Sequence, residues 1–306
     1  MIGMAGGESR SLAFDVFLLV LANVIWGGTD VAAKFALESL SPAGLLELRL
    51  SIALLAFLPV LWFRRGEIPR GAFGLWPFLV LGACGFFLDF LLVYHGLKLA
   101  PASHATALRI TEVLAIVVLS GLILREKVSR RAGLGLCLGM AGVVLVLNID
   151  FRRLGLFATG ARLGDLLIIA GITVEALYTV LGKRVLKRQS PLTTIALAVF
   201  FAWLLMSVFF GVRVAREFIS RPPSSGSLLA CVYLGLVALA LANYIYYRVL
   251  SRRHSHQVAV SIMLQPLVGI PLARLIFHEP LTPKFLTGAA LIAAGVYAAL
   301  MIKERG

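Results

Sequence analysis

Residues 126–142 read EKVSRRAGLGLCLGMAG, and residues 279–295 read EPLTPKFLTGAALIAAG. The two stretches share a glutamate, a hydroxyl residue three positions later and two glycines, all at one offset of 153 residues (279 − 126 = 153). The same offset relates Tyr94 to Tyr247 and Gly82 to Gly235. A constant offset over this length indicates an internal duplication. The number of hydrophobic segments in each copy then decides the fold, because an odd number inverts the second copy in a membrane.

Nearer the N-terminus of each copy the offset changes to 149. There Lys34 pairs with Lys183 (183 − 34 = 149), and the Ser41-Pro42 pair meets Ser190-Pro191. The two copies therefore differ by a short insertion. We predict repeat boundaries at residues 12–147 and 164–302.

The composition is that of an integral membrane protein. Hydrophobic residues make up 60% of the chain and charged residues 14%, against ~25% charged in soluble domains, and the mean hydropathy is +0.94. The apolar runs approach the ~20 residues that a helix needs to cross a bilayer. We predict an all-α protein with ten spans, at residues 12–34, 42–63, 75–97, 102–124, 132–147, 164–185, 192–212, 228–250, 256–278 and 284–302.

Five spans fall in each copy, so the sequence predicts two inverted five-helix repeats, the arrangement of many secondary transporters. With the N-terminus inside, the cytoplasmic segments carry about twice as many lysines and arginines as the opposite segments, in keeping with the positive-inside rule. We therefore expect a multi-pass protein of the cytoplasmic (inner) membrane with both termini in the cytoplasm.

Several other functions are disfavoured by the distribution of charge and cysteine. The net charge is +14, but the basic residues punctuate the spans and form no arm or patch for nucleic acid. The three cysteines lie in three separate predicted spans, which supports neither a disulfide framework nor a zinc site. No Walker A pattern is present. We expect no cofactor and no metal.

The ordered motifs resemble a known family. One copy shows Trp26-Gly27, Lys34, Ser41-Pro42 and Arg49, then Ala100-Pro101-Ala102-Ser103 and Glu126-Lys127-Val128-Ser129 with glycines 135, 139 and 142; the other shows Gly164-Asp165, Ser190-Pro191, Gln265-Pro266, Glu279-Pro280-Leu281-Thr282, Gly288 and Gly295. This series resembles two EamA repeats of the drug/metabolite transporter superfamily, from about residue 12 to 302. The resemblance implies ten helices in inverted 5+5 topology and export of small metabolites, commonly amino acids or related compounds.

Depth in the bilayer selects the candidate site residues. An ionisable group at mid-bilayer costs roughly 2.5–3.5 kcal/mol on insertion scales, so such groups should face protein or water. Glu112 and Gln265 occupy equivalent positions of the two repeats (265 − 112 = 153). The polar residues near the centres of their spans are Asn23, Asp89, Glu112, Glu175, Asn243 and Gln265.

Arg109 and Glu112 lie three apart on one helix and can pair on one face. The pair has two interpretations: a structural ion pair, or a cavity lining in which Glu112 releases and accepts a proton. Asp30 lies closer to the outer end of its span, where simple hydration is the expectation and a site role the alternative.

Spans six and eight add aromatic groups to these charges. Glu175 and Tyr178 share one stripe, and Asn243 shares another with Tyr246 or Tyr247. A carboxylate beside aromatic rings suits an organic substrate that carries an amine, although tyrosines are ordinarily core or interface residues. The predicted substrate-binding or coupling residues are Asp89, Arg109, Glu112, Glu175, Tyr178, Asn243, Tyr247 and Gln265.

Two features of the loops and spans carry structural predictions. Pro266 and Pro271 predict a kink in the ninth span, since each removes a backbone donor. Glu126 and Glu279 lie at loop edges and are expected to cap turns and helices.

We expect a permease that exports a small organic metabolite by alternating access, driven by protons or by the substrate's own gradient. A flippase for lipid-linked substrates uses the same fold and stays open as an alternative. An intramembrane enzyme is a weaker alternative, because the spans contain no His-Glu-x-x-His, Gly-x-Ser-x-Gly or close Asp pair. The partners are a small-molecule substrate and the lipid bilayer; the sequence does not indicate an oligomeric state.

Overall fold

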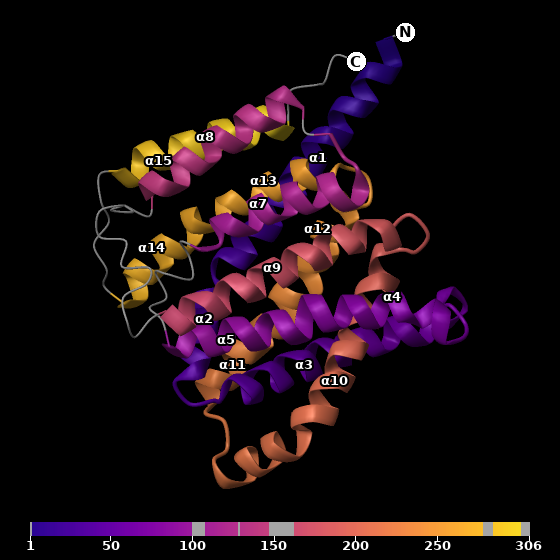
Figure 1. Cartoon of the computed structure of the whole chain (residues 1–306), viewed down its shortest axis with the longest axis vertical. Coiled ribbons are helices and arrows are strands. Elements are labelled where there is room, and N and C mark those ends of the chain that lie inside the picture. The colour runs from indigo at the N-terminus through magenta and orange to yellow at the C-terminus, as the bar shows by residue number, and fades with distance from the viewer. Residues whose placement is uncertain (1, 100–107, 128, 147–161, 278–283, 301–306) are drawn as a thin grey trace.

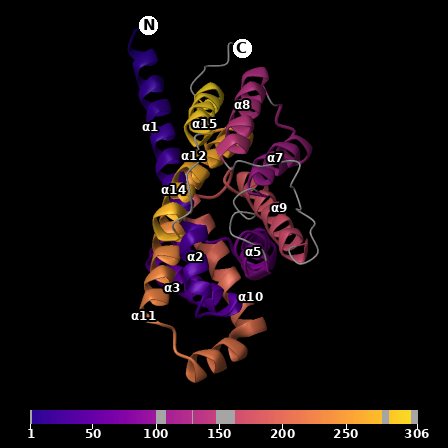
Figure 2. The ribbon, with the colours of Figure 1, turned by 90° about the vertical axis from the view of Figure 1, so that its left-hand side faces the viewer.

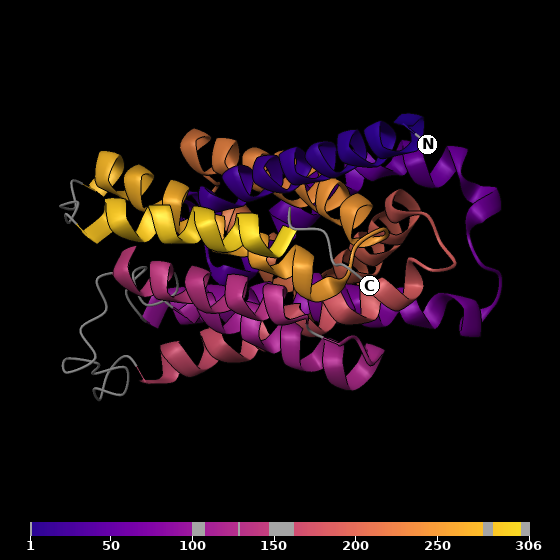
Figure 3. The same cartoon turned by 90° about the horizontal axis from the view of Figure 1, so that it is seen from above.

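The structure is a computed structural model that describes residues 2–99, 108–127, 129–146, 162–277 and 284–300. All regular elements in these residues are helices, and most run along one common direction (Figures 1 and 3). The elements are α1 (Ile2–Gly27), α2 (Thr29–Leu37), α3 (Pro42–Phe63), η1 (Arg65–Glu67), α4 (Ala72–Gly82), η2 (Ala83–Leu88), α5 (Asp89–Leu99), α7 (Ile110–Leu119), η3 (Ser120–Leu124), α8 (Arg130–Val146), α9 (Arg162–Val185), α10 (Pro191–Ser220), α11 (Ser225–Val232), η4 (Tyr233–Ala242), α12 (Asn243–Leu250), α13 (Ser255–Val260), η5 (Ser261–Leu264), α14 (Gln265–Phe277) and α15 (Lys284–Leu300).

Six helical stretches are long and apolar enough to cross a membrane, which confirms a multi-pass all-α protein. Three shorter apolar helices, at 111–124, 132–145 and 286–299, fall within further predicted spans. The first residues of the predicted span 102–124 lie outside the described residues, and the count of ten stays a prediction. The six long stretches are Leu12–Leu37, Pro42–Phe63, Ala72–Leu99, Leu163–Val185, Pro191–Ser220 and Ser225–Leu250.

The predicted ninth span is broken, as its prolines suggested. Residues 255–260 form α13, a 3₁₀ turn (η5) follows, and α14 begins at Gln265. Pro266 stands in the first turn of α14, where its missing N–H needs no partner, and Pro271 lies inside the helix. The break places the side chain of Gln265 at the junction of two helical segments.

Contacts between the two halves of the chain repeat at equivalent positions. A Cβ atom on Gly235 would lie 2.8 Å from the carbonyl oxygen of Arg49, and a Cβ atom on Gly82 would press against the carbonyl oxygen of Ala198. Gly82 and Gly235 are equivalent at the offset of 153, and Arg49 and Ala198 at 149 (198 − 49 = 149). The backbone of α4 therefore packs on α10 as that of η4 packs on α3.

Helices α8 and α15 form a second junction between the halves and lie side by side (Figures 1 and 2). A Cβ atom on Gly135 would lie 2.6 Å from the carbonyl oxygen of Gly295, and one on Gly142 would lie 2.6 Å from that of Gly288. At the offset of 153, Gly135 is equivalent to Gly288 and Gly142 is equivalent to Gly295. The Gly135–Gly295 contact and the Gly142–Gly288 contact are therefore equivalent to each other. Glycine is required here because any side chain would separate the two backbones.

The N-terminus of α3 is tied to the second half through Ser41, and we call this contact the Ser41 clasp. The Ser41 hydroxyl caps α3 by accepting a hydrogen bond from the Gly44 N–H at 3.0 Å. The Ser41 backbone N–H donates to Oε1 of Glu217 at 2.8 Å, and its hydroxyl donates to Oε2.

The N-terminus of α10 is tied to the first half in the same way, and we call this contact the Ser190 clasp. The Ser190 hydroxyl caps α10 at the Thr193 N–H (3.3 Å) and donates to Oε2 of Glu67 at 3.1 Å. Thr193 donates to the same oxygen at 2.7 Å. Ser41 and Ser190 are equivalent residues, so the caps of α3 and α10 are each completed by a glutamate of the other half.

Candidate functional site

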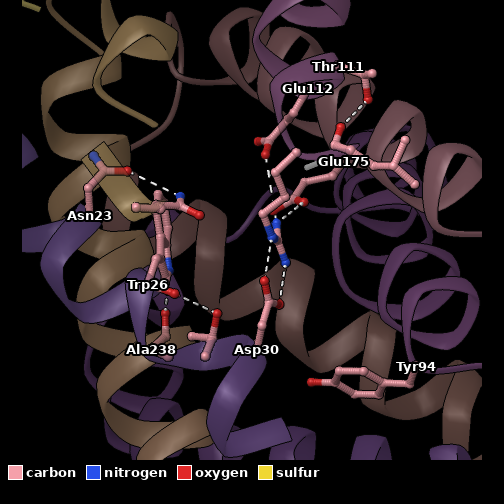
Figure 4. A network of polar contacts seen from close by, with 12 residues as sticks. Asn23, Trp26, Asp30, Tyr94, Thr111, Glu112, Glu175 and Ala238 are labelled. Carbon is pink, nitrogen blue, oxygen red and sulfur yellow. Dashed lines mark hydrogen bonds and ion pairs between the residues drawn. The ribbon is translucent and has the colours of Figure 1, made fainter. Parts of the chain in front are cut away.

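The centre of the candidate site is the guanidinium of Arg109, at the start of α7. Its Nε and Nη2 atoms donate to the two carboxylate oxygens of Asp30, each at 3.0 Å. Glu175 lies 3.5 Å from Nη1 and Glu112 lies 3.8 Å from it. Figure 4 shows the three carboxylates converging on one point. Three acidic groups therefore share one arginine.

These four residues come from three elements that the chain folds together. Asp30 stands in the first turn of α2, Glu112 in the first turn of α7, and Glu175 in the middle of α9, which packs against α7. The side chains are 5–25% exposed. Ion pairs at such depth compensate part of the desolvation of each charge, which is why the carboxylates gather around the arginine.

A second polar group lies across from this cluster and contains amides in place of charges. Asn23 of α1 donates to the Ser261 hydroxyl at 2.9 Å and to the Leu19 carbonyl at 2.8 Å. Gln265, at the break before α14, donates to the Asn23 side-chain oxygen at 3.2 Å. This group joins α1 to the broken helix, and the side chains of Asn23 and Gln265 are both buried within the protein.

A π-helical segment supplies an acceptor beside this second group. Trp26 donates its indole N–H to the Ala238 carbonyl at 2.9 Å (Figure 4), and the Asn243 amide donates to the same oxygen at 3.3 Å. Ala238 lies in the π-helical segment η4, and the equivalent segment of the first half, η2, is also π-helical. Such segments are frequent at functional sites.

A cavity lies between these groups, and its enclosed part, about 30 Å³, has room for a few water molecules at most. Its charged lining consists of two arginines, Arg49 and Arg109, and two acids, Asp30 and Glu175. The remaining lining residues are Trp26, Thr29, Ala33, Gly85, Phe86, Phe90, Val93, Tyr94, Tyr178, Asn243 and Gln265.

Five of the eight predicted site residues line this cavity: Arg109, Glu175, Tyr178, Asn243 and Gln265. The other three do not. Glu112 reaches the cavity only through Arg109. Tyr247 is fully buried and stacks on Tyr178 with ring centroids 5.0 Å apart.

Asp89 is the third predicted residue that does not line the cavity. It begins α5, directly after η2, and it is fully buried. Neither of its carboxylate oxygens has a hydrogen-bond partner among the described residues. A buried carboxyl group without a partner is costly as an anion.

Three of the cavity residues that the sequence analysis missed or underrated bear on the charge and shape of the site: Asp30, Arg49 and Trp26. Asp30, expected to be hydrated, is instead the closest ion-pair partner of Arg109, so that expectation is wrong. Arg49 and Trp26 were noted only as family motifs. The depth rule would have found Arg49, because it is the eighth residue of the apolar stretch 42–63.

Glu126 and the histidines of the turn 251–255 lie outside the cavity. Glu126 accepts a hydrogen bond from the Ser255 N–H at 2.9 Å and pairs with His256 at 3.4 Å and His254 at 3.7 Å. The predicted capping role of Glu126 is confirmed, whereas Glu279 lies outside the described residues. Among the described residues no group of three or more His, Cys, Asp or Glu side chains is arranged so that it could hold a metal ion.

The helices and the charged cavity between the two halves define a class of protein, the multi-pass membrane transporters. The model of the EamA-like transporter family matches residues 13–148 and again residues 162–301. The chain therefore belongs to this family, within the drug/metabolite transporter superfamily.

Similar proteins extend over nearly the whole chain. An uncharacterized transporter of Archaeoglobus fulgidus is 29% identical over 285 residues, which cover 92% of this chain and 95% of the relative. Proteins described as probable amino-acid metabolite efflux pumps, from Salmonella typhimurium and Escherichia coli, are 26% and 24% identical; each match covers 92% of this chain and 93% of the relative. A solved crystal structure at 21% identity has the same fold, with a TM-score of 0.73 over 94% of this chain and 97% of its own.

Proposed function

We propose that this protein is a secondary transporter that exports a small organic metabolite, an amino acid or a related compound, across the cytoplasmic membrane. The observation that carries the proposal is the charged cavity, which is lined by residues of both halves of the chain. In alternating access, two inverted halves, 12–147 and 164–302, rock around such a central site with both termini in the cytoplasm. The names of the Salmonella and Escherichia relatives support the direction and the substrate class.

The acidic groups around Arg109 are suited to coupling. Three carboxylates share one guanidinium, so the cluster carries excess negative charge when all three are ionised. Uptake of one proton would relieve that excess, and Glu112 is enclosed enough (4% exposed) to hold the proton away from water. We propose Glu112 and Glu175 as the groups that link proton movement to the cavity.

The test is transport by purified protein in proteoliposomes with an imposed pH gradient. We expect gradient-driven efflux or uptake by the wild type and loss of its pH dependence in Glu112→Gln and Glu175→Gln. Glu38→Gln is the matched control, because Glu38 is an exposed carboxylate at the end of α2. Unchanged coupled transport in both cavity variants would show that the coupling residues are wrongly assigned.

The alternative, a flippase for lipid-linked substrates, shares the fold. It predicts transfer of a fluorescent lipid between leaflets with no effect of soluble metabolites. Competition of that transfer by an amino acid would favour the exporter instead.

A further inference from the structure

The two arginines that line the cavity differ in their partners. Arg109 is held by three carboxylates, the nearest at 3.0 Å. Arg49 forms no ion pair with any described residue, although it is only 3% exposed. Its guanidinium is thus a buried positive charge with no carboxylate of the described residues within 4.0 Å; Glu175 and Asp89 act on it only from farther away.

The guanidinium of Arg49 is held in place but not saturated. Nε donates to the Leu234 carbonyl at 3.1 Å, Nη1 donates to the Tyr94 hydroxyl at 2.5 Å, and the Phe90 ring lies 3.8 Å from Cζ. An arginine has five N–H donors, so three of them have no partner among the described residues. A planar fork with free donors is the geometry that binds a carboxylate in bidentate fashion.

The duplication provides an internal control for a purely structural role. The residue equivalent to Arg49 in the second half is Ala198. Gly235 packs against the backbone of Arg49, and the equivalent glycine, Gly82, packs against the backbone of Ala198. The helix junction therefore forms with alanine as well as with arginine. Packing of α3 does not explain why a charge is buried at position 49.

The charge of the cavity lining restricts the ligand further. With Glu112 and Asp89 protonated, the two arginines and two acids of the lining cancel in charge, and a ligand without net charge leaves that balance intact. Glu175 is held only at 3.5 Å by Arg109 and is the more available of the two acids, because Asp30 is engaged through both oxygens. Around the charges lie the rings of Trp26, Phe86, Phe90 and Tyr178.

We propose that Arg49 binds the carboxylate of a zwitterionic substrate, with the ammonium group towards Glu175 and an apolar side chain against the aromatic rings. The inference rests on the proposed transport function and names the substrate class: α-amino acids with apolar side chains, and not amines or their amides. Tyr94 and Phe90 are positioning residues, since they fix the guanidinium plane.

The experiment uses the full chain, purified in nanodiscs. Ligand affinity is read from the concentration dependence of thermal stabilisation for leucine, phenylalanine and methionine, each beside its α-amide and its decarboxylated amine. We expect the wild type to bind the acids at least about tenfold more tightly than the amides and amines, the loss that follows from one missing charge-assisted hydrogen bond. Equal binding of acid, amide and amine would overturn the assignment without any mutation.

Variants locate the effect. We expect Arg49→Gln to weaken binding of the acids at least about tenfold and to abolish their advantage over the amides, and Arg49→Lys to retain part of it. Arg64→Gln is the control, because Arg64 is an exposed arginine after the end of the same helix. Acid binding by Arg49→Gln at wild-type affinity would also overturn the proposal.

Transport separates this proposal from the one on which it rests. Wild-type proteoliposomes that move the amines as fast as the acids would contradict the role of Arg49 and leave the transport function standing. Proteoliposomes that move no acid, amide or amine of the panel, and no other metabolite, would contradict both.

Discussion

At the scale of single residues, Glu126 joins two segments that are far apart in the chain. Burial alone would raise the pKa of its carboxyl group, but the close contact with His256, the hydrogen bond from the Ser255 N–H and the charges of the two nearby histidines lower the pKa below its usual value. His254 and His256 are the titratable groups that face it within 4.0 Å. Glu126 therefore stabilises the folded state as an anion.

This arrangement predicts a pH-dependent stability difference. Because the folded-state pKa of Glu126 is lowered, its contribution is complete above the unfolded value, about 4.5, and is lost as the pH falls through the folded value. We expect Glu126→Gln to be about 1 kcal/mol less stable than the wild type near neutral pH, the usual cost of a lost cap. The difference should shrink in acid. Thermal unfolding in detergent from about pH 7 to about pH 2 measures it, and a constant difference over that range would contradict the assignment.

The position of a polar residue along its predicted span selected the candidate site residues, but it did not predict which neighbours each side chain faces. Arg109 and Glu175 were found together, yet Asp89 and Tyr247, equally central, lie outside the cavity lining. The direction of a side chain depends on helix rotation, which tertiary packing decides. Asp30 was misjudged for a related reason, since the arginine that holds it lies 79 residues away in the chain.

At the scale of helices, the junction of α8 and α15 depends on glycine at particular positions of one face. Gly135 lies against the backbone of Gly295, whereas Gly133, two residues earlier, has open space beside it. Both are in the first two turns of α8. They form a matched pair that separates close packing from helix propensity.

We expect Gly135→Ala to destabilise the protein by about 1–3 kcal/mol, because the added methyl group forces the two backbones apart. Gly133→Ala should be neutral or stabilising by up to about 1 kcal/mol, since alanine favours the helix. Unfolding in a denaturant series measures both. Equal effects of the two substitutions would mean that α8 and α15 are not in backbone contact.

The helical elements were predictable in extent but not in their irregular turns. Apolar length located α3 and α9 closely, whereas α10 continues eight residues past the predicted end at residue 212, and the prolines indicated the break before α14. The π-helical segments η2 and η4 have no such signal, because an extra residue in a turn is stabilised by neighbouring helices and not by local sequence. The acceptor at Ala238 was therefore unpredictable.

At the scale of the whole molecule, the Ser41 and Ser190 clasps fasten the two ends of the α3 and α10 pair. Each clasp joins a capping serine of one half to a glutamate of the other. The duplication was predictable from the sequence offsets, and equivalent contacts follow it in space. The sequence did not identify Glu217 and Glu67 as the partners of Ser41 and Ser190. Their separation of 150 residues (217 − 67 = 150) matches neither of the repeat offsets, 149 and 153.

The two clasps should contribute independently to stability. Removal of a serine cap by Ser41→Ala or by Ser190→Ala is expected to cost about 1 kcal/mol in each case. The double variant should cost about 2 kcal/mol, since effects add when sites lie far apart, and a 22-residue helix is about 33 Å long. Denaturant unfolding of the two single variants and the double variant gives the comparison. A clearly larger loss in the double variant would show that the clasps act as one unit.

The Ser41 clasp also bears on the order of events during synthesis. Ser41 is followed by 176 residues before its partner Glu217 is made, a delay of about 9–35 s at the usual pace of translation. For most of that interval α3 has been synthesised but lacks the carboxylate that engages its cap, and the contact between Gly135 and Gly295 forms later still. The nascent first half therefore lacks its contacts with the second half, and its surface stays accessible to chaperones or lipid until the second half is made.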